Sequence, residues 1–204
     1  ITEGKMNRLA ILVIGSYLCF WSCGNVPDIR YYLIEYPLTS MDKGEPKYDF
    51  TLGVEKFTAN ALYNDDRFVY RESPYEARYD YYRRWITPPA KIVTEKVLEH
   101  FKSSGLFQRV VSYPHYAEVD YLLRGHLKAF EEWDEGEKWY ARVILEVELI
   151  NMKTQQLVWR GESSKLTLAA RREPSEVVKA MSISLKTCIE EILMVLGREN
   201  QIFP

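Results

Sequence analysis

A cysteine near the start of the chain is the residue whose position most clearly predicts chemistry. Residues 9–21 (LAILVIGSYLCFW) carry no charge and follow the basic residues Lys5 and Arg8, which is the pattern of an export signal. Cys23 comes directly after the small residue Ser22 at the end of this run, as the cysteine does in a bacterial lipobox. In that motif the thiol is lipidated and the cysteine becomes the mature N-terminus. The sequence therefore predicts a covalent lipid, palmitate among its acyl chains, on Cys23.

Other interpretations of this segment remain open. In one, Cys23 is an ordinary thiol that follows a plain secretory signal, since Phe20 and Trp21 stand where a lipobox usually has Leu and a small residue. Cys19 is a weaker lipid acceptor because Leu18 precedes it. An uncleaved membrane-spanning helix is the least favoured interpretation. Such a helix needs about 20 apolar residues, and the run at residues 9–21 is shorter.

No other group of residues has the spacing of a catalytic or metal site. The sequence has no GxSxG elbow, no P-loop and no GxGxxG motif. Three histidines stand apart on a predicted helix, a loop and a strand: His100, His115 and His126. Acidic residues gather beside Gly136, where a solvated hairpin turn explains them better than catalytic carboxylates or a calcium site: Glu131, Glu132, Asp134, Glu135 and Glu137. We therefore predict no enzyme, no metal and no cofactor besides the lipid on Cys23.

Length and composition narrow the class of protein further. The chain has 204 residues, of which 47% are hydrophobic, so it is long enough for one packed domain and too apolar for a disordered chain. It has 27 basic and 29 acidic residues, a net charge of −2. Because no global positive field is available to hold a phosphate backbone, we expect no nucleic-acid partner.

The chain is expected to divide into a signal peptide, a lipid anchor with a short tether, and one periplasmic α+β domain: residues 1–22, 23–30 and 31–204. Residues 1–5 look like translated upstream sequence, because Met6 begins a normal signal. Gly24 follows the cysteine where an Asp would favour retention in the inner membrane. We therefore expect a lipid-anchored protein of the cell envelope, on the outer membrane and facing the periplasm.

Alternating and branched apolar residues predict strands at seven places: residues 31–36, 48–54, 67–71, 106–111, 121–133, 139–150 and 156–168. The links at residues 134–138 and 152–155 are short enough for hairpins, so the last three strands should form an antiparallel meander.

Helical spacing predicts two helices. The first covers residues 88–104, with Thr87 as its cap and Gly105 as its stop. The second covers residues 174–196 and ends at Gly197; Cys188 lies on its apolar stripe and should be a small buried thiol. The expected fold class is α+β, an antiparallel β-sheet with two main helices packed on one face.

Residues 75–85 alternate between a largely aromatic face and a mostly charged one. Such a strand covers the core with its aromatic face or presents that face to a partner. A base-stacking platform is disfavoured for an exported protein. Because Tyr, Trp and Arg dominate interface energetics, we name three candidate partner contacts here: Tyr79, Tyr81 and Trp85.

The order of several short segments resembles a known family. These segments are Cys23, YYLIEY (31–36), LGV (52–54), RFVYR (67–71), the tyrosine-rich stretch that ends in Arg84 and Trp85, the helix that begins at Pro88, and VDYLLRGHLKAFE (119–131). In this order, over most of the mature chain, they look like an ABC-type transport auxiliary lipoprotein of the PqiC-like group.

The resemblance implies a non-enzymatic component of an MCE-type system that moves lipids between the inner and outer membranes. The lipoprotein would dock the periplasm-spanning MCE-domain protein, and self-association into a homo-oligomer is a further expectation. An alternative is an outer-membrane lipoprotein that assists lipopolysaccharide or barrel assembly. An enzyme acting on envelope lipid or glycan is a third, weaker hypothesis.

Overall fold

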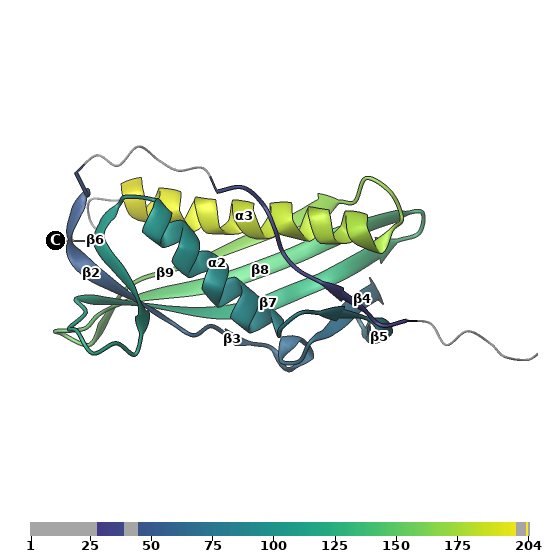
Figure 1. Ribbon diagram of the computed structural model, residues 1–204, viewed down its shortest axis with the longest axis horizontal. Coiled ribbons are helices and arrows are strands. Elements are labelled where there is room, and N and C mark those ends of the chain that lie inside the picture. The colour runs from purple at the N-terminus through teal and green to yellow at the C-terminus, as the bar shows by residue number, and fades with distance from the viewer. Residues whose placement is uncertain (1–27, 39–44, 199–202, 204) are drawn as a thin grey trace, which may run out of the picture.

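The computed structural model describes residues 28–38, 45–198 and 203. They form one sheet of nine strands with two long helices lying across it (Figure 1). The predicted signal and Cys23 lie outside the described residues. No helix in the described part of the chain is long and apolar enough to cross a membrane.

Most strands follow the predicted positions closely, but the strand predicted at residues 31–36 is wrong beyond Tyr32, because β1 covers only Arg30–Tyr32. The structure adds a two-residue strand, β3, and a short 3₁₀ helix, η1, that alternation could not indicate. The elements are β1 Arg30–Tyr32, β2 Tyr48–Glu55, β3 Thr58–Ala59, η1 Ala61–Tyr63, β4 Arg67–Ser73, β5 Glu76–Trp85, α2 Pro89–Ser103, β6 Phe107–Tyr113, β7 Tyr121–Glu135, β8 Lys138–Asn151, β9 Gln156–Leu168 and α3 Pro174–Arg198.

Strand β7 organises the sheet. One of its sides pairs with β8, which in turn pairs with β9, so the predicted antiparallel meander is confirmed. Its other side carries β2, β3 and β4 one after another, all parallel to it. β2 pairs in parallel with β6, and β1 with β5. The prediction of an antiparallel sheet is therefore wrong for the sheet as a whole, which is mixed. Alternation reports which face of a strand is buried, but not the direction of its neighbour.

Both helices pack on one face of this sheet (Figure 1). The apolar residues of β8 that point to this face are completely buried: Ala141, Val143, Leu145 and Leu149. Cys188 of α3 is also fully buried, and burial raises its pKa to about 11, so the prediction of a structural thiol is confirmed. Gly125 lets the ring of Phe57 pack against β7, because a Cβ there would lie 2.0 Å from that ring.

The helix ends differ from the predictions in detail. Pro88, not Thr87, occupies the cap position of α2, and no side chain caps that end. Gly105 takes a positive φ of 65° after α2, as its role as a stop requires. Helix α3 does not end at Gly197 but continues to Arg198.

Candidate functional site

The three candidate contact residues lie on β5, whose pairing with β4 is interrupted by a large bulge. Val69 pairs with Tyr79, and Arg67 pairs with Arg84, so two steps along β4 correspond to five along β5. The extra residues push the chain of β5 outward around Asp80. A bulge of this kind changes the direction of side chains next to it and is a common feature of functional sheet edges.

Asp80 holds the bulge in shape. One of its carboxylate oxygens accepts hydrogen bonds from the backbone N–H groups of Tyr82 (2.7 Å) and Arg83 (2.8 Å), and the other accepts one from Arg83 Nε (2.7 Å). Burial raises the pKa of Asp80, but the Arg83 and backbone hydrogen bonds outweigh it and leave this pKa below its ordinary value. The carboxylate is therefore charged and locks a turn into the strand.

The bulge places the three aromatic residues in different environments. Tyr81 projects into solvent and is 83% exposed, whereas Tyr79 is half-buried beneath Arg67, whose guanidinium lies 3.7 Å from the ring centre. Trp85 is only 1% exposed and stacks on Phe68 at 4.7 Å. Trp85 is therefore a core residue in this structure, and the surface available to a partner reduces to Tyr79 and Tyr81.

Tyr79 and Tyr81 belong to a pocket of about 420 Å³ that we call the Tyr–Arg pocket. Its lining residues come from β4 and β5: Arg67, Tyr70, Arg78, Tyr79, Asp80, Tyr81 and Arg84. Three guanidinium groups and three phenol rings give it a surface that suits aromatic, carboxylate or phosphate groups of a partner. Each of its three guanidinium groups is already paired with a carboxylate: Arg67 with Asp65, Arg78 with Glu76 and Arg84 with Asp66.

Buried ion pairs support this pocket from inside. Arg83 Nη1 lies 2.5 Å from Glu132 Oε2, and the Glu132 side chain is 1% exposed. Burial raises the pKa of Glu132, while Arg83 opposes that shift. Because Arg83 also binds Asp80, it connects the bulge of β5 to the central strand β7.

A second buried carboxylate, that of Glu131, lies next to Glu132 on β7. Glu131 accepts a hydrogen bond of 2.5 Å from the Tyr63 hydroxyl, and the guanidinium groups of Arg142 and Arg71 lie 3.3 and 3.7 Å from it. Both guanidinium groups also lie within 6 Å of the Trp133 ring. Burial, followed by the charge of Glu131, raises the pKa of Tyr63, so its hydroxyl stays a donor.

The interpretation of the acidic residues as a solvated turn is thus wrong for Glu131 and Glu132. Only the end of that group, around Gly136, forms the turn between β7 and β8. The signal was present in the predicted strand over residues 121–133, which already contains both glutamates and which the structure extends to Glu135. Their arginine partners lie far away in sequence or on another strand, where spacing alone cannot identify them.

Asp134 gives this end of the sheet a testable pH dependence. Burial, reinforced by Glu132, raises its pKa from 3.8 to about 7. The folded state therefore holds this proton more tightly than the unfolded chain, and its contribution to stability falls as the pH rises from about 4 through 7. Allowing for solvent screening at a half-buried site, we expect Asp134→Asn to stabilise the protein at pH 8 by about 2 kcal/mol.

Urea unfolding of the wild type and of Asp134→Asn at pH 8 and pH 4 measures this effect as the difference between their free energies of unfolding. We expect the advantage of the variant to disappear at pH 4. The comparison with the wild type at each pH is needed because buried His100 has the opposite effect on the pH dependence of stability. Desolvation lowers the pKa of His100 from 6.5 to about 4. Its contribution to stability is therefore lost as the pH falls from about 6.5 towards 4. An advantage of equal size at both pH values would contradict the assignment to Asp134.

The three histidines lie apart from one another in the described structure. His100 bonds to Tyr36, and His126 bonds to Thr58 and Asn60. Within residues 28–38, 45–198 and 203, no group of three or more His, Cys, Asp or Glu side chains is placed to hold a metal ion.

The fold and this surface define a small α+β protein with a pocket of tyrosine rings and ion-paired arginines at one end of its sheet. A family model described as "ABC-type transport auxiliary lipoprotein component" matches residues 31–193. The chain therefore belongs to that family, and the resemblance inferred from its sequence segments is confirmed. Members of this family are lipoproteins of the cell envelope that serve as auxiliary components of ABC-type transporters.

Solved structures share this fold at low sequence identity. A Xanthomonas campestris protein assigned to the family model DUF330 is 20% identical, with a TM-score of 0.71 over 80% of this chain and 92% of that one. A structure described as an uncharacterized protein is 15% identical, with a TM-score of 0.64 over 83% and 99%. The PelC dodecamer from Paraburkholderia phytofirmans is 14% identical, with a TM-score of 0.47 over 80% and 95%. A search of curated proteins found no significant match.

Proposed function

We propose that this protein is a non-enzymatic, lipid-anchored auxiliary component of an MCE-type ABC transport system that moves lipids between the two membranes. Cleavage after Ser22 releases the mature chain, Cys23 carries the lipid, and residues 31–204 form the periplasmic domain at the outer membrane. The body docks the periplasm-spanning MCE-domain protein. The observation that carries this proposal is the family match over residues 31–193, which includes the whole Tyr–Arg pocket.

The Tyr–Arg pocket is the docking surface in this proposal. Tyr81 is a large, rigid side chain that stands free of the body, and Tyr79 lies fixed under Arg67 beside it. Tyr and Arg are among the residue types enriched at the positions that dominate the binding energy of protein interfaces. The Asp80 hydrogen bonds and the Arg83–Glu132 pair hold the bulge in one conformation, which lowers the entropy lost on binding.

Replacement of Tyr81 by Ser tests this surface. An affinity pull-down of the membrane-extracted protein is expected to recover the MCE-domain protein, and Tyr81→Ser should reduce the recovered amount at least about tenfold, the effect of losing an interface anchor. Tyr116→Ser is the matched control, because Tyr116 is 98% exposed on a loop distant from the pocket. Equal recovery with Tyr81→Ser and the wild type would remove the pocket from the docking surface.

A further inference from the structure

A strip of exposed apolar side chains lies at the edge of the sheet, on and beside β1. Ile29, Tyr31 and Leu33 are 42%, 57% and 54% exposed, and Ile86 is 60% exposed. The N–H of Ile86 donates to the carbonyl of Tyr32, which holds Ile86 against this segment. We call these four residues, Ile29, Tyr31, Leu33 and Ile86, the β1 strip.

The strip is the outward-facing side of a short segment that carries apolar residues on both sides. Ile29, Tyr31 and Leu33 occupy alternate positions, so an extended chain directs them to the same side. The residues between and after them point the other way: Tyr32 packs against Phe68, and Ile34 is 4% exposed. The core therefore accounts for one half of the segment and leaves the other half, which is also apolar, facing outward.

The position of the strip in the chain indicates what covers it. Ile29 is six positions after Cys23, and an extended chain of that length spans at most about 20 Å. A lipid on Cys23 therefore keeps the strip beside the bilayer surface. Exposed Leu157, at the start of β9, pairs with Ile150 and through it with the start of β7, whereas β4 joins β7 near its end, so Leu157 lies far from the strip. Exposed Leu166 and Leu168 lie at the β4 end of the sheet, but on β9, which four other strands separate from β1.

We propose that the body of the protein sits directly on the bilayer through the β1 strip, whose side chains enter the boundary between headgroups and acyl chains. This inference rests on the proposed lipidation of Cys23 and goes beyond it, because an anchor alone leaves the orientation of the body free. Aliphatic and aromatic side chains are the groups that prefer this layer of a membrane.

Charge does not select the type of lipid here. Arg30 lies among the strip residues, but exposed Asp28 and Glu35 flank it, and Arg84 behind it is paired with Asp66. Contact with the membrane should therefore occur on neutral lipid as well as on anionic lipid, and should resist added salt.

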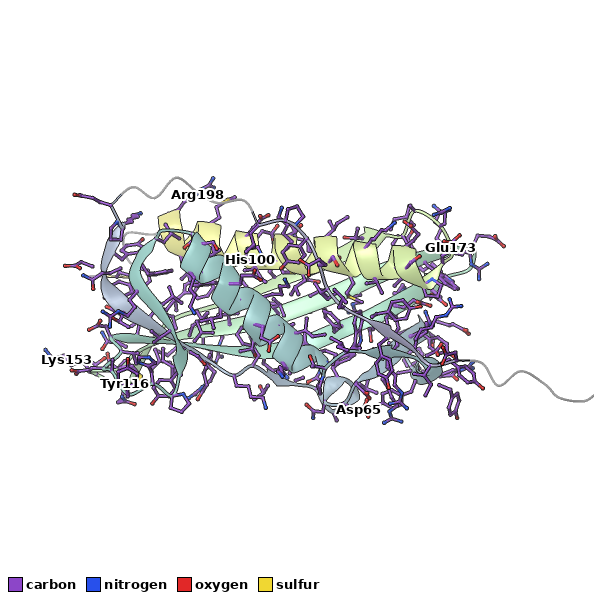
Figure 2. All side chains as sticks on the ribbon, viewed as in Figure 1. Asp65, His100, Tyr116, Lys153, Glu173 and Arg198 are labelled. Atoms are coloured by element: carbon purple, nitrogen blue, oxygen red, sulfur yellow. The ribbon has the colours of Figure 1, made fainter. Side chains whose placement is uncertain are left out.

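This orientation places the Tyr–Arg pocket beside the membrane, because β1 pairs with β5 through Arg30 and Arg83 and through Tyr31 and Arg84. The loops that carry Tyr116 and Lys153 lie at the other end of the long axis and point away from the bilayer (Figure 2). A partner docked at the pocket would thus meet the protein at the membrane surface.

A fluorescent label at position 33 tests the proposal on the full-length, acylated protein bound to phosphatidylcholine vesicles. Leu33→Cys would carry an environment-sensitive dye, and Leu157→Cys, which replaces a residue of nearly equal exposure (50%), is the control. The native Cys188 is buried with a pKa of about 11, so it does not compete for the dye. Thermal unfolding of each labelled protein verifies its fold.

We expect a blue-shifted emission at position 33 that nitroxide-bearing lipid quenches, and neither effect at position 157. Cosedimentation with the vesicles and an unshifted emission at position 33 would overturn this proposal alone. Failure to cosediment would overturn the lipid anchor and this proposal with it. A blue shift that appears without vesicles and grows with protein concentration would show that a second copy covers the strip, which also contradicts the proposal.

Discussion

A Cys23→Ser protein is expected to leave the membrane fraction. Each buried methylene of an acyl chain contributes about 0.8 kcal/mol, so one chain gives marginal binding and two or more give a stable anchor. Without these chains only the β1 strip would touch the bilayer, and we expect the membrane-bound fraction to fall from nearly all of the protein to below about a tenth. Fractionation of cells that express the variant measures this loss, and labelling with radioactive palmitate shows whether the lipid is attached.

Cys19→Ser is the matched control for this experiment. It replaces a cysteine four positions away that lacks a small residue before it, and the protein should stay on the membrane and take up palmitate. If Cys19→Ser releases the protein while Cys23→Ser does not, the acceptor is Cys19 and the boundary of the mature chain moves. If both variants stay bound and unlabelled, the chain is held by something other than a covalent lipid.

A Glu131→Ala protein is expected to lose about 3–5 kcal/mol of its free energy of unfolding, the usual effect of removing one partner from a buried ion pair. The Glu131 side chain is fully buried, and its loss leaves the Tyr63 hydroxyl without its acceptor and two guanidinium groups without a counter-charge. Because Arg71 and Arg142 retain part of their solvent contact, the loss should lie toward the lower end of this range. Urea-induced unfolding followed by tryptophan fluorescence measures it.

Glu135→Ala, at the end of the same strand, is the control for this variant. Glu135 is exposed and its side chain bonds only to Trp133 Nε1 in the described structure, so we expect a change within about 0.5 kcal/mol. Tyr63→Phe removes only the hydroxyl and should cost about 1 kcal/mol. A loss below about 1 kcal/mol for Glu131→Ala would mean that the charges around it contribute little and that Trp133 and its apolar neighbours stabilise this junction instead.

These experiments separate two properties of the same end of the molecule. In the proposed function Cys23 determines where the protein is held, whereas Glu132 of β7, through Arg83, holds the bulged β5 against the central strand. A variant that stays on the membrane but loses its partner would point to the Tyr–Arg pocket. A variant that unfolds would point to the β7 network behind it.

Local patterns in the sequence predicted most of the individual elements. A period of two identified the long strands of the meander, and helical spacing with a positive-φ glycine at position 105 identified α2. These patterns report burial on one side of a segment, which neighbouring residues determine. They carry no information about β3, whose two residues are too few to show a period, or about the parallel pairing of β2, β3 and β4 with β7.

The sequence by itself determined most of the elements, the candidate lipid site at Cys23 and the family to which the chain belongs. Only the tertiary structure decided that Trp85 is core while Tyr81 is surface, because a bulge set by Asp80 breaks the alternation between them. Only it showed that Glu131 and Glu132 are buried. The reason is that a buried carboxylate needs hydrogen-bond donors or counter-charges beside it, and the donor Tyr63 of Glu131 and the counter-charge Arg83 of Glu132 lie 68 and 49 positions away along the chain.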